Sequence, residues 1–347
     1  MSTQTAGTSM QPDYRITLQG QTISPEFRAR LASLTLNDRR GMQADQLDIV
    51  LTDDDGMLDI PPTGAQITLA IGWKGQALVE RGTFTVDEVE HTGAPDTLSI
   101  RASSADLRQG LPGKRTQSWD AVTVRDIITT IAKRHNLTPS VGATLAGVRI
   151  THIDQTDESD LHFLTRLAER FDAVATVKTG HLIFVPTGQA TTASGLEIPP
   201  IHLRRQSGDQ HRYLMAERDA YTGVTALWNN TAHATREAVT VGDPENAQQL
   251  RHTYASEEEA LEAAQAEWQR IQRGSAYFSI TQAIGDPEIF PEKPAWCIGW
   301  KPKIDATPWV ITEVTHNLTE SSYTTALQLE THGKELNNRT KIITPEL

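Results

Sequence analysis

The chain has 347 residues, which is too long for one ordinary hydrophobic core and indicates two or three domains. It carries 44 acidic against 32 basic residues, and the resulting net charge of -12 disfavours a protein whose main role is to bind nucleic acid, because phosphate neutralisation needs a basic face. Its single cysteine, Cys297, excludes a disulfide framework within one chain, and no stretch approaches the roughly 20 apolar residues that span a bilayer, so no membrane insertion is expected.

Residues 1–13 are small and polar and predict a disordered lead-in, not a signal peptide, since they lack an apolar segment. Residues 14–108 then alternate apolar and polar side chains in short runs that predict half-buried strands. The clearest runs are 47–51, 66–71 and 83–89. Turn signals such as Asp54-Asp55-Gly56 lie between them. This region predicts an all-β barrel or sandwich.

The pattern changes over residues 109–190, which predict a small α/β domain. Residues 123–135 place apolar side chains on one helical face, behind a Thr123 and Asp126 capping box. A second helix is expected over about 159–170. The runs 174–177 and 182–185, joined by a turn, predict a β-hairpin.

Strand patterns return over residues 191–335, interrupted by a helix predicted for 257–273 with Ser256 as its N-cap. The last residues, 336–347, are expected to form a C-terminal tail. The fold class that follows is mixed β and α+β, with two similar tube-like β-barrel modules separated by the α/β domain.

An internal repeat relates the two β-rich regions. Ile71-Gly72-Trp73-Lys74 recurs as Ile298-Gly299-Trp300-Lys301, and residues 84–91 are echoed by 309–316 at nearly the same spacing. Alternating strands with Gly-Trp turns can resemble one another through shared physics, but here order, spacing and residue identity agree together. One chain would then carry two copies of a module, so a trimer would present six, in a ring with three-fold symmetry in sequence and near six-fold symmetry in shape.

Three stretches resemble a known family, the phage late control gene D proteins, which are tail hub proteins of P2-like phages and are similar to the hub half of type VI secretion spikes. The stretches are residues 47–71, 113–120 and 155–164. The most specific is 155–164, Gln-Thr-Asp-Glu-Ser-Asp-Leu-His-Phe-Leu, because neither amphipathicity nor capping demands that order of polar residues. Residues 309–316 extend the resemblance along nearly the whole chain.

The resemblance implies a non-enzymatic baseplate hub of a contractile phage tail or a phage-derived particle, assembled in the bacterial host cytoplasm. Its expected partners are two further copies of itself, the tail spike protein and the tail tube protein, with tape-measure and other baseplate proteins as further candidates. The alternatives are a tail-associated cell-wall hydrolase and a type VI-like injection spike component. The resemblance implies no specific nucleic acid as a partner.

No residue pattern predicts catalysis, a metal site or a cofactor. The Asp53-Asp54-Asp55-Gly56 run lacks the alternating ligands of a calcium loop, and the histidines of the α/β domain lack metal-site spacing. The candidate interface residues are Trp73, Lys74, Trp300 and Lys301, at equivalent positions of the repeat. Each tryptophan could equally cover the end of its own module.

Overall fold

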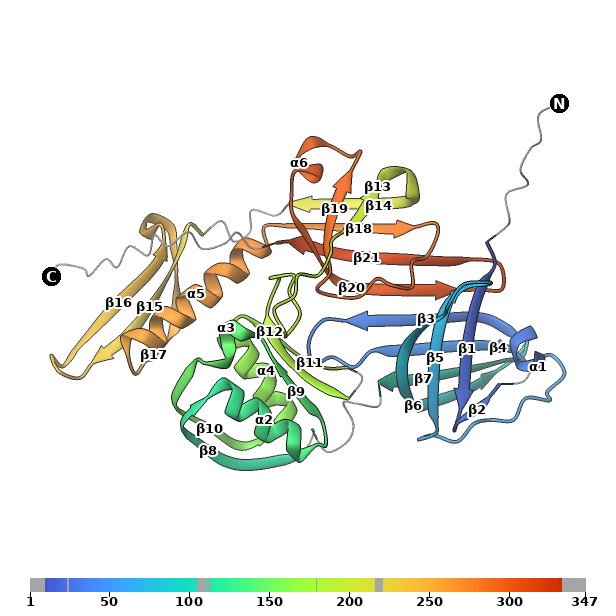
Figure 1. The fold of residues 1–347 in the computed structure, drawn as a ribbon, viewed down its shortest axis with the longest axis horizontal. Coiled ribbons are helices and arrows are strands. Elements are labelled where there is room, and N and C mark those ends of the chain that lie inside the picture. The colour runs from blue at the N-terminus through green and yellow to red at the C-terminus, as the bar shows by residue number, and fades with distance from the viewer. Residues whose placement is uncertain are drawn as a thin grey trace.

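The computed structural model describes residues 10–23, 25–104, 111, 113–178, 180–215 and 221–332. Its largest element is a 13-stranded sheet in which strands from the two ends of the chain lie side by side (Figure 1). The α/β domain lies against this sheet, and a further small sheet with one long helix lies at the other end of the molecule (Figure 1).

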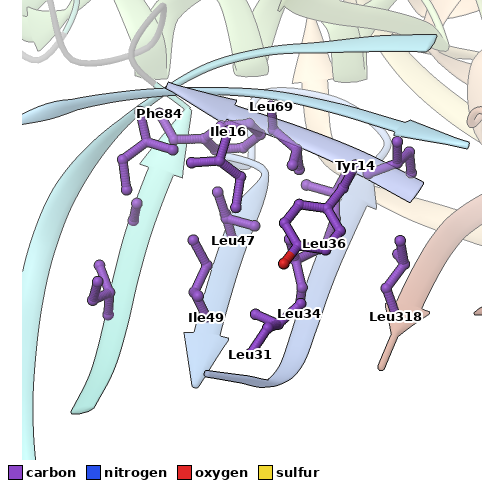
Figure 2. Packing of buried hydrophobic residues seen from close by; sticks show 14 of the residues in the cluster. Tyr14, Ile16, Leu31, Leu34, Leu36, Leu47, Ile49, Leu69, Phe84 and Leu318 are labelled. Carbon is purple, nitrogen blue, oxygen red and sulfur yellow. The ribbon is translucent and has the colours of Figure 1, made fainter. Parts of the chain in front are cut away.

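The N-terminal strands form the first β module. Its elements are β1 (Pro12–Leu18), β2 (Gln21–Thr22), α1 (Pro25–Ala29), β3 (Leu31–Arg39), β4 (Gln46–Thr52), β5 (Gln66–Trp73), β6 (Val79–Thr92) and β7 (Thr97–Ser104). Every second side chain of β3 and β4 is buried, as the alternating sequence predicts. These side chains fill one hydrophobic core, in which Leu34, Leu47 and Ile49 are almost fully buried (Figure 2).

The second β module is assembled from two separated stretches. Its elements are β13 (Ile201–Arg204), the 3-10 turn η2 (Arg205–Ser207), β14 (Gly208–Met215), β18 (Ala276–Gln282), β19 (Pro294–Ile298), α6 (Pro302–Asp305), β20 (Trp309–Leu318) and β21 (Tyr323–Thr331). In its core, Phe278 packs on both Trp300 and Trp309.

The two modules are joined because β3 pairs antiparallel with β20. The prediction of a mixed β and α+β fold with two similar β modules and an intervening α/β domain is confirmed. Neither module is a closed barrel among the described residues, since β3 uses its second edge for β20 and the sheet ends at β2 and β14. The barrels expected from the sequence are therefore open.

The α/β domain has its own hydrophobic core. Its elements are β8 (Lys114–Thr123), α2 (Val124–Arg134), β9 (Thr138–Val141), α3 (Ala143–Ala146), β10 (Arg149–Ser159), α4 (Asp160–Arg170), β11 (Ala173–Lys178) and β12 (His181–Pro186). The predicted capping box is present in α2, where the Thr123 side chain and Asp126 bond reciprocally. β11 and β12 form the predicted hairpin, and β9 adds to it in parallel.

A separate three-stranded sheet lies within the region expected to form the second module. It consists of β15 (Gly223–Asn230), β16 (Thr235–Gly242) and β17 (Ala247–Tyr254), with the 3-10 turn η3 (Pro244–Asn246) and helix α5 (Glu257–Arg273). The helix begins after Ser256 as predicted and buries its alanines against the sheet. The sequence division placed these strands in the second module because strand patterns do not identify the sheet to which a strand belongs.

The ends of the chain fall mostly outside the described residues. These are residues 1–9 of the expected lead-in and the whole of the expected tail, 336–347. The first strand begins at Pro12, within the range expected for the lead-in. Within the described ranges, none of the helices is both long enough and apolar enough to span a bilayer.

Candidate assembly surfaces

The repeated blocks occupy the same topological places. In the first module the strands follow the order β1-β5-β6-β7-β4-β3, and in the second the order β13-β19-β20-β21-β18-β14. The blocks that contain Trp73 and Trp300 end the second strand of each order, and the blocks 84–91 and 309–316 lie in the third. One difference remains, since β1 runs antiparallel to its neighbour and β13 runs parallel.

The irregularities of the strands also repeat, and they fix the correspondence residue by residue. Opposite β7, β6 has a bulge between Val86 and Glu88, and opposite β21, β20 has one between Ile311 and Glu313. Likewise, β3 has a bulge after Leu31 and β14 has one after Gly208. The duplication inferred from the sequence therefore extends to strand register.

The joint between the modules uses one edge of each. Opposite residues of β3 and β20 bond through their side chains, with Thr315 Oγ1 2.8 Å from Asn37 Oδ1 and Thr35 Oγ1 3.1 Å from Asn317 Oδ1. Leu318 of β20 lies beside the leucines of β3 (Figure 2) and belongs to the core of the first module. The joint therefore combines side-chain hydrogen bonds with a shared hydrophobic core.

Trp73 contributes to this joint from the first module. Its ring lies 5.2 Å, centroid to centroid, from that of Tyr323, and its Nε1 donates to the Gly285 carbonyl at 2.9 Å. A Cβ atom at Gly285 would lie 2.4 Å from the Tyr323 ring, so only glycine fits there. The neighbouring Lys74 is exposed and donates to Gln11.

Trp300 occupies the equivalent position in the second module but has no equivalent partner. Its ring is buried against Phe278 and His211, at centroid distances of 5.4 and 6.1 Å. Its Nε1 is buried without a hydrogen-bond partner among the described residues. Lys301 is exposed, like Lys74. Both candidate tryptophans thus lie inside the monomer at module ends, while the two lysines face solvent.

Two strand edges that correspond to the closed joint are open. Within the described residues, β14 pairs on one side only, with β18, and the part of β6 beyond Val86 pairs only with β7. The open edge of β14 carries Leu214 and Met215, which are 41% and 48% exposed. The open part of β6 carries Glu90 and His91, which are also exposed. Unpaired strand edges are templates for pairing with another chain.

Comparison with known proteins identifies the family. The model of the family "Phage tail baseplate hub (GPD)" matches residues 43–322. The chain belongs to the phage tail baseplate hub family. It is 44% identical over 94% of its length to a probable baseplate hub protein of Escherichia phage 186, and 42% identical over 97% to one of Escherichia phage P2; the matches cover 94% and 97% of those proteins.

Solved structures share the fold of this hub protein at low sequence identity. The 43 kDa tail protein of prophage MuSo2 from Shewanella oneidensis matches 92% of this chain and 98% of its own with a TM-score of 0.68, at 15% identity. The Escherichia coli c3393 protein, a type VI secretion component, matches 96% of this chain and 79% of its own with a TM-score of 0.55, at 14% identity. The family resemblance expected from the sequence is confirmed.

The most specific motif of the resemblance builds the interior of the α/β domain of this hub protein. Asp160 is fully buried and accepts hydrogen bonds from Gln155 at 2.9 Å and from Arg134 at 2.9 and 3.0 Å, while His135 Nε2 lies 2.7 Å away. Burial alone would raise the pKa of Asp160, but these hydrogen bonds lower it below its usual value. This buried network accounts for the order of polar residues in the motif.

Ion pairs attach the α/β domain to the modules. Lys178, at the end of β11, lies 2.8 Å from Asp38 of β3 and also contacts Asp45. Burial and the nearby Asp38 raise the pKa of Asp45 to about 6. On the other side, Arg273 of α5 pairs with Asp172 in a buried contact. These contacts hold the parts of the hub in one arrangement.

Candidate metal ligands do not come together among the described residues of the hub. No three side chains of the His, Cys, Asp or Glu types form a group there that could hold a metal ion. Asp53 and Asp55 face Arg30 instead. Burial raises the pKa of the Cys297 thiol to about 12, so little thiolate forms at neutral pH.

The open edges were not among the residues predicted from the sequence. The repeat of 84–91 and 309–316 could have predicted that β6 is a pairing edge, because the second copy of the repeat lies in β20, which forms the closed joint. β14 has no such signal. Its inward residues His211 and Tyr213 correspond to Leu34 and Leu36 of β3, and these pairs share no residue type.

Proposed function

We propose that this protein is the structural hub of a contractile phage tail baseplate, working as a homotrimer that joins the six-fold tail tube to the three-fold central spike. The observation that carries the proposal is the duplicated β module with conserved strand register, together with membership of the baseplate hub family. Three copies of a two-module chain present six similar modules, which matches a hexameric tube. We also propose the domain division 14–108, 109–190 and 191–335.

A non-enzymatic role is part of this proposal. The 186 and P2 relatives are named probable baseplate hub proteins. A cell-wall hydrolase would need reactive groups in a cleft. Here the Cys297 thiol is inert and Asp160 is part of a buried network, which supports a structural role for both residues. The proposed partners are the tail tube protein and the tail spike protein, in a virion baseplate assembled in the host cytoplasm.

The oligomeric state tests the proposal most directly. Light scattering of the purified full chain at micromolar concentration is expected to give the mass of three chains, because obligate interfaces bury roughly 2,000 Å² or more. A low-resolution electron-microscopy reconstruction should then show a ring of six β lobes with three-fold symmetry. A stable monomer at that concentration would overturn the proposal. Clearing of a peptidoglycan suspension by the protein would favour the hydrolase instead.

A further inference from the structure

We infer that the open edge of β14 pairs antiparallel with the open part of β6 from a second copy of the chain, in the register that β3 and β20 use within one chain. The inference rests on the proposed homotrimer and specifies how its subunits join. Its basis is the correspondence of β14 with β3 and of β6 with β20, shown by shared strand order and shared bulges.

The closed joint supplies the register. Within one chain, Asn37 lies opposite Thr315, and these residues correspond to Leu214 and Glu90. The cross-strand pairs expected between copies are written here with the β14 residue first: Arg212 with Thr92, Tyr213 with His91, Leu214 with Glu90, and Met215 with Val89. Each copy would use its β14 toward one neighbour and its β6 toward the other, so the contact is heterologous and closes a ring.

The side chains on these edges suit the pairing. Arg212 of one copy would lie diagonally across from Glu90 of the next, where opposite charges attract. Leu214 is 41% exposed on an edge strand, which is an aggregation liability unless another strand covers it. On the inner face, Tyr213 would meet His91, as Leu36 meets His316 in the closed joint.

Trp300 provides an independent observation. In the closed joint, the Trp73 indole donates to the carbonyl of Gly285, whose own N–H donates to the Tyr323 carbonyl. The same backbone bond recurs in the first module, from Asp53 N–H to the Asp96 carbonyl at 2.9 Å. Asp53 therefore corresponds to Gly285. Its carbonyl already accepts from the Gly56 N–H, and in a second copy it would accept a second hydrogen bond, from Trp300, once the side chains that cover the Trp300 Nε1 in one chain shift on assembly. Buried indole N–H groups ordinarily have a partner.

The occupant of these edges is a second copy because both halves of the joint lie on the same chain. β14 with Trp300 forms one half, and β6 with Asp53 forms the other. A strand from a different tail protein would fill one edge and leave the other open. The closed joint shows that the corresponding strands of the two modules, β3 and β20, fit each other.

Paired cysteines test the register. The double variant Leu214→Cys, Glu90→Cys places two cysteines directly opposite each other across the proposed contact. Directly opposite residues have Cβ atoms about 4.5–5.5 Å apart, close to the spacing that a disulfide needs. Mild oxidation should then link copies into covalent species of two and three chains on a non-reducing gel. Each single variant can link at most two chains. The native Cys297 is buried and does not compete.

The matched control is Asn37→Cys, Thr315→Cys, at the corresponding positions of the closed joint. It should form a disulfide within one chain, with loss of free thiols and no gain in mass. If wild type is trimeric and the control closes, but Leu214→Cys, Glu90→Cys stays at the mass of one chain, the strand pairing is wrong while the hub proposal survives. A wild-type monomer by light scattering would overturn both. Circular dichroism confirms that each variant is folded.

Discussion

The two β modules of this hub share one strand order but use their edges differently. In the first, β3 is covered by β20 of the same chain. In the second, β14 at the corresponding position is covered on one side only, within the described residues. The same backbone plan therefore gives a closed joint and an open one. The difference shows that a duplicated module can provide an internal contact with one copy and a subunit contact with the other.

Side chains distinguish the closed edge from the open one. Leu34 and Leu36 of β3 lie in the core of the first module, whereas the corresponding His211 and Tyr213 of β14 lie beside Phe278 and Trp309. Aromatic side chains with polar atoms are enriched where one surface is both apolar and partly solvated. These two inward side chains of β14 are thus consistent with an edge that is exposed until another chain arrives.

The hairpin ends differ in the same way. Tyr323, at the end of β20–β21, is 1% exposed and sits in the core of the first module, where its hydroxyl lies 2.8 Å from His316 Nδ1. The corresponding residue of β6–β7 is Asp96, in a turn whose residues are largely exposed. A joint built on Asp96 buries less apolar surface, so we expect the contact between chains to be weaker than the joint within one.

The largest effect is expected from Tyr323→Ala. Truncating a buried aromatic residue costs about 3–5 kcal/mol, and here it would also remove the contact with Trp73. Urea denaturation followed by circular dichroism, at matched protein concentration, measures the loss. Asp96→Ala is the control at the corresponding position and should change the free energy of unfolding by less than about 0.5 kcal/mol. Equal losses from the two variants would contradict the difference between the joints.

A smaller loss is expected from Asp160→Asn, which lies in the α/β domain and outside the duplication. Removing the charge leaves Arg134 without its anionic partner, at a cost of about 3 kcal/mol. Since the pKa of Asp160 is lowered in the folded state, its contribution is present above the unfolded pKa and disappears as pH falls through the folded pKa. The variant should therefore be less sensitive to acid than wild type.

The measurement for Asp160→Asn is thermal unfolding followed by tryptophan fluorescence between pH 3 and pH 7. Trp119, packed on Phe163, reports the α/β domain. Its transition should move to lower temperature while the transition of the sheet stays in place. A single transition that shifts as a whole would instead mean that the modules and the α/β domain unfold together. The stabilities of the two joints could then not be separated from that of the α/β domain.

The variants Trp73→Phe and Trp300→Phe compare the two joints, because each removes the indole N–H of one tryptophan. The first removes the hydrogen bond to Gly285 and should lower the free energy of unfolding by about 1–2 kcal/mol. The second shares the loss of ring packing but removes an N–H that is unpaired within the described residues of one chain, so it should destabilise the monomer less than Trp73→Phe does. Light scattering across a dilution series should show weaker trimers for Trp300→Phe. Unchanged dissociation would remove Trp300 from the subunit contact.

The sequence predicted the three long helices well because each has a local signature, whereas it did not predict the short helices α1, α3 and α6. Thr123 and Ser256 cap α2 and α5 as predicted, and α4 begins at Asp160, one residue after its expected start. The repeat also located both modules. Strand partners were beyond such signals, since pairing of β3 with β20 joins residues nearly 300 positions apart in the chain and is set by tertiary packing, not by local sequence. The open edges follow from that pairing, so they too required the structure.

The smallest effect concerns Asp38, which lies at the closed joint next to the α/β domain. Asp38 and Asp45 share the single ammonium group of Lys178, and burial together with this repulsion raises the pKa of Asp45 to about 6. A folded pKa above the unfolded value means that the folded state binds more protons between pH 4 and pH 6, so stability from this group decreases as pH rises through that window. Asp38→Asn should remove the repulsion and, relative to its effect at pH 5, stabilise the protein at pH 8 by about 1 kcal/mol, the order of the interaction between two nearby like charges.

Urea midpoints of wild type and Asp38→Asn, measured at pH 5 and pH 8, check this sign. The gain should be present at pH 8 and nearly absent at pH 5, where Asp45 of wild type is already protonated. Lys178→Met is the opposing control, because it leaves two carboxylates without their cation and should destabilise the protein more at pH 8 than at pH 5. The position of β14 that corresponds to Asp38 is Met215, which carries no charge, so this pH response is specific to the closed joint.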